Sequence, residues 1–120
     1  MTRLLGDYER ARAFCREAIA LSAETGDRRH EGHVWDSLGL AEYHLGNLAE
    51  AADCYERALS LNREAGDRLN EAHTLIHLGD SRDAVGERAQ ARNAWQQALD
   101  ILDDLHHPDA EEARAKLAGS

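Results

Sequence analysis

Several histidines and aspartates have the types and spacing that could bind a metal ion. His73 and His77 stand four residues apart, which places both on one face of a helix. His33 could approach from a neighbouring segment, and Asp36 or Asp80 could add an oxygen ligand, as at a zinc site. The HExxH motif is absent, and repeated histidines also serve packing or capping. We therefore expect no metal and no cofactor, with metal binding as the alternative.

The same histidines could act through their charge. His33, His44, His73 and His77 would become positive near pH 6, because an imidazole titrates close to that value. If they share one surface, its affinity for a peptide should change with pH. Peptide binding that is constant between about pH 5.5 and 8 would contradict this hypothesis.

The sequence offers no catalytic nucleophile. The serines lack the Gly-x-Ser-x-Gly elbow, and no glycine-rich phosphate loop is present. Paired carboxylates such as Asp103–Asp104 and Glu111–Glu112 are most simply solvated helix ends. We therefore predict that the chain is not an enzyme.

Composition narrows the class of protein. The 120 residues suit one domain, and few are β-branched, so the chain should be all-α. Its net charge of −9 argues against a nucleic-acid partner, which needs clustered Lys and Arg. No apolar run is long enough to span a membrane. Cys15 and Cys54 lie within apolar helical patterns and suggest no disulfide, which favours a cytoplasmic location.

The elements that position these residues follow from an internal repeat. Glycines recur every 40 residues at Gly6, Gly46 and Gly86, and a Gly-Asp-Arg triplet recurs at Gly26 and Gly66. The same period relates the following further sets: Leu38-Gly39 and Leu78-Gly79; Ala11, Ala51 and Ala91; Ala18, Ala58 and Ala98; His33 and His73. Repeats of this length indicate a solenoid, in which each unit buries its apolar face against the next.

The glycines divide each unit into two helices. Gly26 and Gly66 suit the left-handed residue that ends a helix, and the aspartate after each suits the N-cap of the next. Asn47 with Glu50 resembles a capping box, and Pro108 suits the first position of a last helix. The predicted helices are 7–25, 28–45, 47–65, 68–85, 87–105 and 108–118. Turns of one or two residues make neighbouring helices antiparallel.

The repeat resembles the tetratricopeptide repeat, whose signature is W-x2-L-G-x2-Y, then A-x3-F, then P. Trp35-x2-Leu38-Gly39 and Ala51-x3-Tyr55 match the first two parts, and Leu78-Gly79 with Ala91-x3-Trp95 matches in the next unit. The period exceeds the usual value of about 34 residues, and the closing proline is missing. The resemblance implies a right-handed α-solenoid of antiparallel hairpins. Long repeats with Gly-Asp-Arg junctions are similar to arrays in bacterial transcriptional and signalling regulators.

The resemblance also implies where a partner binds, because the first helix of each tetratricopeptide hairpin lines a concave groove. The groove positions are His33, Asp36, Ser37, Leu40, Tyr43, His44, His73, Ile76, His77, Asp80 and Asp83, followed by Ala113 and Lys116. The Lys, Asn and Arg set of the carboxylate-clamp subtype is lacking. A basic or mixed peptide, or an apolar helix on Leu40, Tyr43 and Ile76, is the expected partner.

The phase of the repeat leaves half-units at both ends. We expect a half-repeat over 1–25, repeats over 26–65 and 66–105, and a half-repeat over 106–120, in a fragment of a longer array. Unpaired apolar faces, such as Ala113 with Leu117, would otherwise meet other chains. We therefore predict a scaffold that binds a protein or peptide, as the sensor or interaction arm of a regulator. The alternative is a module that self-associates through its terminal half-repeats.

Overall fold

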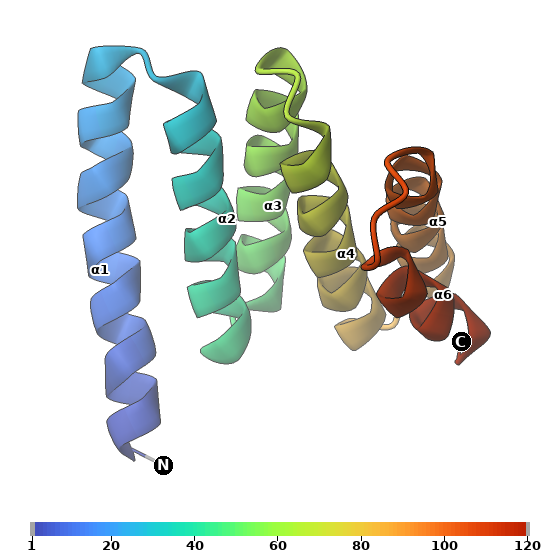
Figure 1. Cartoon of the computed structure of the whole chain (residues 1–120). Coiled ribbons are helices and arrows are strands. Elements are labelled where there is room, and N and C mark those ends of the chain that lie inside the picture. The colour runs from blue at the N-terminus through green and yellow to red at the C-terminus, as the bar shows by residue number, and fades with distance from the viewer. Residues whose placement is uncertain (1, 120) are drawn as a thin grey trace.

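Six helices stand in one row in the computed structural model, which describes residues 2–119, with side chains from residue 6 onward. They are α1 (Thr2–Thr25), α2 (Arg28–His44), α3 (Leu48–Glu64), α4 (Arg68–Ala84), α5 (Arg88–Asp104) and α6 (Ala110–Ala118). Each helix packs against the next, and α2 also touches α4. Figure 1 shows α1 at one end of the row, and α6 in front of α5 at the other end. The prediction of an all-α solenoid is confirmed.

Most predicted caps are present. Asp27 and Asp67 accept hydrogen bonds from the backbone nitrogens of His30 and Asn70, at 3.1 and 3.2 Å. The capping box predicted at Asn47 is wrong, since the Asn47 side chain makes no cap bond. Its Nδ2 donates instead to Oε1 of Glu42, 3.1 Å away, which ties the turn back to α2.

Both terminal helices begin elsewhere than predicted. The first runs through Gly6 from Thr2, because one glycine inside a helix costs only about 1 kcal/mol and does not end it. The last begins at Ala110, because Pro108 and Asp109 form a turn instead of the first helical turn. His106 occupies the repeat position of Gly26 and Gly66 and adopts the same left-handed backbone, with φ of 53°.

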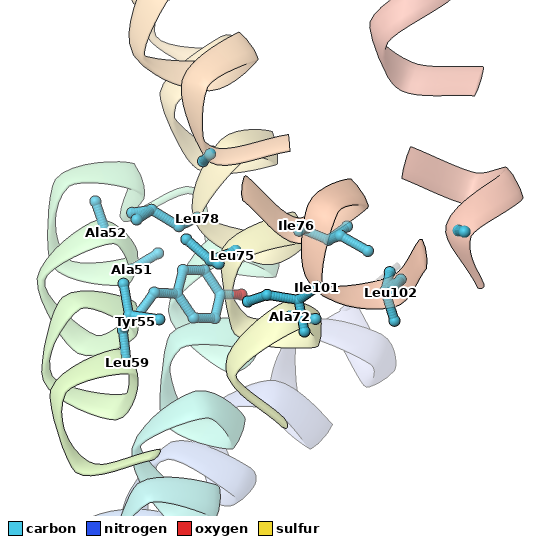
Figure 2. Packing of buried hydrophobic residues seen from close by; sticks show 13 residues of the cluster. Ala51, Ala52, Tyr55, Leu59, Ala72, Leu75, Ile76, Leu78, Ile101 and Leu102 are labelled. Atoms are coloured by element: carbon cyan, nitrogen blue, oxygen red, sulfur yellow. The ribbon is translucent and has the colours of Figure 1, made fainter. Parts of the chain in front are cut away.

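The Leu-Gly pairs of the repeat mark close contact between helices of one hairpin. A Cβ placed on Gly39 would lie 2.5 Å from the Tyr55 ring, and one placed on Gly79 would lie 2.4 Å from the Trp95 ring. Only glycine therefore lets the aromatic ring of the second helix lie on the backbone of the first. Tyr55 lies within an apolar cluster contributed mainly by α3, α4 and α5, which Figure 2 shows from close by.

The two ends of the row differ in polarity. On α1, Phe14 and Leu21 are 72% and 63% exposed, although their repeat counterparts Cys54 and Leu61 are buried. At the other end, Ala113 is fully buried and Leu117 is half-buried, so the predicted exposed pair on the last helix is wrong. α6 packs against α5. Among the described residues, the two most exposed large apolar side chains therefore lie on α1.

Candidate functional site

Three side-chain pairs join α2, α4 and α6 along one face of the row. His77 Nδ1 on α4 lies 3.1 Å from Asp36 Oδ1 on α2. His73 Nε2 on α4 lies 2.9 Å from Oδ2 of Asp109, which precedes α6. Lys116 Nζ on α6 lies 2.9 Å from Asp80 Oδ1 on α4. These pairs align the first helices of successive hairpins, and we call this surface the α2/α4/α6 face.

A buried polar network supports Asp36. Asn62 Nδ2 on α3 donates to Thr74 Oγ1 at 3.2 Å, and the Thr74 hydroxyl donates to Asp36 Oδ1 at 3.0 Å. Because the Thr74 proton is used on Asp36, Thr74 must accept from Asn62, which fixes the orientation of the amide. Asn62 Oδ1 is buried and has no hydrogen-bond partner among the described residues. That oxygen lies beside Gly32, where a Cβ would approach it to 2.7 Å.

The network occupies positions that are apolar in one repeat counterpart and polar in another. By the 40-residue period, Asn62 corresponds to Leu102 and Ser22, Thr74 to Val34 and Arg114, and Asp36 to Ile76 and, two periods on, Lys116. The apolar counterparts Leu102, Val34 and Ile76 are buried in the core. A buried polar network stabilises a fold less than well-packed apolar side chains do, so packing alone does not account for these three residues.

Asp36 differs from the other poorly exposed carboxylates in its partner. Five of them pair with an arginine or lysine: Glu31 with Arg28, Glu42 with Arg12 and Arg16, Asp67 with Arg29, Glu71 with Arg63, and Asp80 with Lys116. The Asp36 side chain is 19% exposed, and within the described part of the chain its one ion-pair partner is His77. Its charge is thus neutralised only when His77 is protonated.

A pocket of about 230 Å³ opens beside this network. Its lining comes from α2, the end of α3, and α4, and consists of His33, Asp36, Asn62, Asn70, His73, Thr74 and His77. Every one of these side chains is polar. The structure thus brings together four of the predicted groove residues, namely His33, Asp36, His73 and His77.

The protonation of His77 depends on the same contacts. Burial lowers the pKa of His77, but the hydrogen bond and negative charge of Asp36, with smaller effects of Asp80 and Glu112, outweigh it. The net result is a pKa above the ordinary value for histidine. The centroid of the Tyr55 ring on α3 lies 5.5 Å from that of the imidazole.

The other predicted groove residues lie outside this pocket. Ser37 lines a groove between α1 and α2, and the His44 ring stacks on Tyr8 of α1 at 4.5 Å. Leu40 is exposed, Tyr43 is half-buried, and Asp83 pairs with Arg88 at 3.5 Å.

The Ile76 side chain does not face solvent. It is only 3% exposed and packs in the core, so the predicted apolar docking site on Leu40, Tyr43 and Ile76 loses one of its three members. The prediction was wrong because a groove position of the repeat faces solvent only when the neighbouring helices leave it uncovered.

Two groups of reactive side chains show no catalytic arrangement. Within residues 2–119, no group of three or more His, Cys, Asp or Glu side chains has an arrangement that could hold a metal ion. Cys15 and Cys54 are free thiols in a small core cluster with Val34 and Leu38. Burial, helped by nearby negative charges, raises the pKa of Cys54 to about 11, so the reactive thiolate is scarce.

Sequence reasoning missed Asn62, Asn70 and Thr74. Asn62 lies on a second helix of a hairpin, which the family pattern does not assign to the groove. A signal for Asn62 and Thr74 was present in the sequence, since each is polar where one of its two counterparts, Leu102 or Val34, is apolar.

Comparison with known protein families agrees with this geometry. The tetratricopeptide repeat matches residues 32–104, which is more than half of the chain, and a second tetratricopeptide repeat profile matches residues 3–25. No curated protein matches the chain. No helix of the described residues has the length and apolarity needed to cross a membrane. Repeats of this kind generally mediate protein–protein interaction and are typically not enzymes. The chain belongs to the tetratricopeptide repeat family.

Proposed function

We propose that the chain is a scaffold that binds a protein segment or peptide on the α2/α4/α6 face. The observation that carries this proposal is the polar pocket at Asp36, which lies where the first helices of two hairpins meet. Rigid helices position its side chains, and the buried network of Asn62 and Thr74 holds Asp36 in place. A site built in this way is suited to recognise one ligand geometry.

A peptide library displayed on phage tests the location. Leu40→Arg places a long charged side chain on an exposed position of α2, and Ser60→Arg makes the same addition on an exposed position of α3. We expect peptides selected on the wild-type chain to lose affinity for Leu40→Arg and to keep it for Ser60→Arg. Equal binding to both variants would place the partner on another surface.

The finer proposal is that the chain is the sensor or interaction arm of a bacterial transcriptional or signalling regulator. It rests on the 40-residue period and the Gly-Asp-Arg junctions at Gly26 and Gly66. A photo-crosslinking amino acid at position 40, used in the source cell, should capture a component of a regulatory complex. Repeated capture of proteins with no regulatory role would contradict this assignment.

A second candidate function is self-association through α1, with another copy of the chain as the occupant. An apolar groove of about 870 Å³ runs along α1 and α2 and includes Phe14 and Leu21. If two α1 helices cross in antiparallel fashion, Phe14 of each copy faces Leu21 of the other. A self-complementary apolar pair on one patch suits a twofold interface.

The oligomeric state measured by sedimentation tests this candidate. Phe14→Glu should convert a dimer to a monomer, because it places a charge in the centre of the interface. Ala13→Glu adds the same charge at an exposed position of α1 outside the groove, and it should leave the dimer intact. A monomeric wild-type chain at high concentration would exclude self-association.

A further inference from the structure

We propose that the pocket at Asp36 receives the cationic end of a lysine or arginine side chain of the bound peptide. This inference rests on the function proposed above and specifies the chemistry of the partner. Two features of the pocket support it, namely the hydrogen-bond donors and acceptors of the lining side chains and the charge of Asp36.

Five of the seven lining side chains already donate a hydrogen bond within the protein. Asn62 Nδ2 donates to Thr74, and the Thr74 hydroxyl donates to Asp36. Asn70 Nδ2 donates to Asp67 Oδ2 at 2.7 Å. In their neutral forms, His77 donates its Nδ1 proton to Asp36, and His73 donates its Nε2 proton to Asp109.

Acceptors outnumber donors among the atoms that remain. The remaining donors are the second amide protons of Asn62 and Asn70 and one ring N–H of His33, and the remaining acceptors include Asn62 Oδ1. Both bonds to Asp36 fall on Oδ1, and within the described residues Oδ2 accepts none. Asn70 retains its amide oxygen, and the second ring nitrogens of neutral His73 and His77 carry lone pairs. A ligand that satisfies these atoms must donate several hydrogen bonds. An ammonium has three donors and a guanidinium has five, and neither has an acceptor.

Charge selects the same class of ligand. Asp36 is poorly exposed and lacks the arginine or lysine that each comparable carboxylate has. A carboxylate removed from water needs a cationic partner to offset its lost solvation. The peptide would supply this partner, in the way that Lys116 supplies it to Asp80 one repeat further along.

Size limits the ligand to a side chain. The pocket of about 230 Å³ is smaller than the range of roughly 300–1,000 Å³ that small-molecule sites occupy. A single side-chain head group fits this space, with the rest of the peptide lying across the α2/α4/α6 face.

Titration followed by amide NMR tests the inference with defined probes. The probes are Nα-acetyl-arginine methylamide, Nα-acetyl-lysine methylamide and the neutral Nα-acetyl-norleucine methylamide. We expect saturable shifts at residues 33–37 and 70–77 with at least one cationic probe and none with the neutral probe. Equal shifts with the neutral probe, or no saturable shift with either cation, would overturn the inference.

A matched pair of variants assigns the effect to Asp36. Asp36→Asn keeps an oxygen that can accept from Thr74 and His77, so the fold should persist, as thermal melting will check. It should weaken cation binding about tenfold or more, because a hydrogen bond to a charged group is lost. Asp100→Asn removes the same charge from an exposed position of α5 outside the pocket and should have little effect. If Asp36→Asn does not fold, the position of the wild-type shifts decides the question.

The peptides from the display experiment separate this inference from the proposed function. Selected peptides that contain a required Lys or Arg and bind Asp36→Asn weakly would support both. Peptides that are blocked by Leu40→Arg, but tolerate both Asp36→Asn and loss of their cations, would leave the scaffold in place and reject the cation pocket.

Discussion

His77 Nδ1 lies 3.1 Å from Asp36 Oδ1, and this contact joins the first helices of two successive hairpins. The pair therefore has two roles. It holds α2 beside α4, and it sets the charge of the pocket. Any change in the proton on His77 alters both roles.

We predict that His77 has a raised pKa and that Asp36→Asn lowers it. Groups that face the imidazole include Asp36 from α2, Asp80 on α4, Glu112 from α6 and the Tyr55 ring from α3. A raised folded-state pKa means that protonation stabilises the fold fully below about pH 6.5. This contribution is lost as the pH rises through the folded-state pKa. NMR titration of the imidazole would check both values.

The same proton should oppose the binding of a cation. Protonated His77 neutralises Asp36 and repels an ammonium or guanidinium, so affinity for the cationic probes should fall as the pH drops through the His77 pKa. Affinity that stays constant or rises on acidification would show that His77 does not control the pocket. This outcome would also count against the hypothesis that peptide affinity of the groove changes with pH.

The polar network should cost stability. Asn62→Leu with Thr74→Val installs the residues found one repeat away, at Leu102 and Val34. We expect the double variant to be as stable as the wild type or more stable by up to about 2 kcal/mol, because both partners of the Asn62–Thr74 bond are removed together and Asp36 Oδ1, which loses the Thr74 hydroxyl, keeps its bond from His77. Thr74→Val alone leaves buried Asn62 Nδ2 without an acceptor and should cost about 1–3 kcal/mol. Urea denaturation would measure both, and a stable single variant would contradict the assignment of the amide.

Gly39→Ala should destabilise the fold, although alanine is the better helix former. The added methyl would meet the buried Tyr55 ring, and overpacking of this kind costs roughly 1–3 kcal/mol. Gly6→Ala is the control, because Gly6 lies within α1 and a Cβ there meets nothing within 4 Å. It should stabilise by about 0.5–1 kcal/mol. Thermal melting that shifts in the same direction for both would refute the packing argument.

His106→Gly should stabilise the last turn. His106 is exposed and has a left-handed backbone that costs a residue other than glycine roughly 1 kcal/mol. Its repeat counterparts, Gly26 and Gly66, avoid this cost. A melting temperature that rises for His106→Gly, but not for His106→Ala, would assign the gain to backbone conformation.

Local sequence signals predicted the architecture well. The Gly-Asp pairs at 26–27 and 66–67 ended and capped helices as expected, because both effects depend on neighbouring residues alone. Gly6 and Pro108 led to wrong helix boundaries, because the prediction used these residues without the influence of the surrounding chain. Each is a local signal that the surrounding chain overrides, in one case with strong helix formers and in the other with an extra turn.

The candidate site was only partly predictable. His33, Asp36, His73 and His77 followed from their register on first helices, and the structure places them around one pocket. Asn62 could not follow from that register, because it reaches the pocket from the end of α3. Ile76 was predicted to line the groove but is buried. Its burial depends on how closely neighbouring helices pack, which the sequence of one repeat does not specify.

Because α2 to α5 have equal lengths, a chain of this kind could gain or lose a whole repeat by gene duplication or deletion. Each has 17 residues, so duplication or loss of one 40-residue unit would keep every junction in phase. An inserted hairpin would pack as its neighbours do. It would also separate Asp36 from Thr74 and His77, which belong to successive units. The apolar scaffold thus tolerates gene duplication, whereas the pocket permits only one order of its two hairpins.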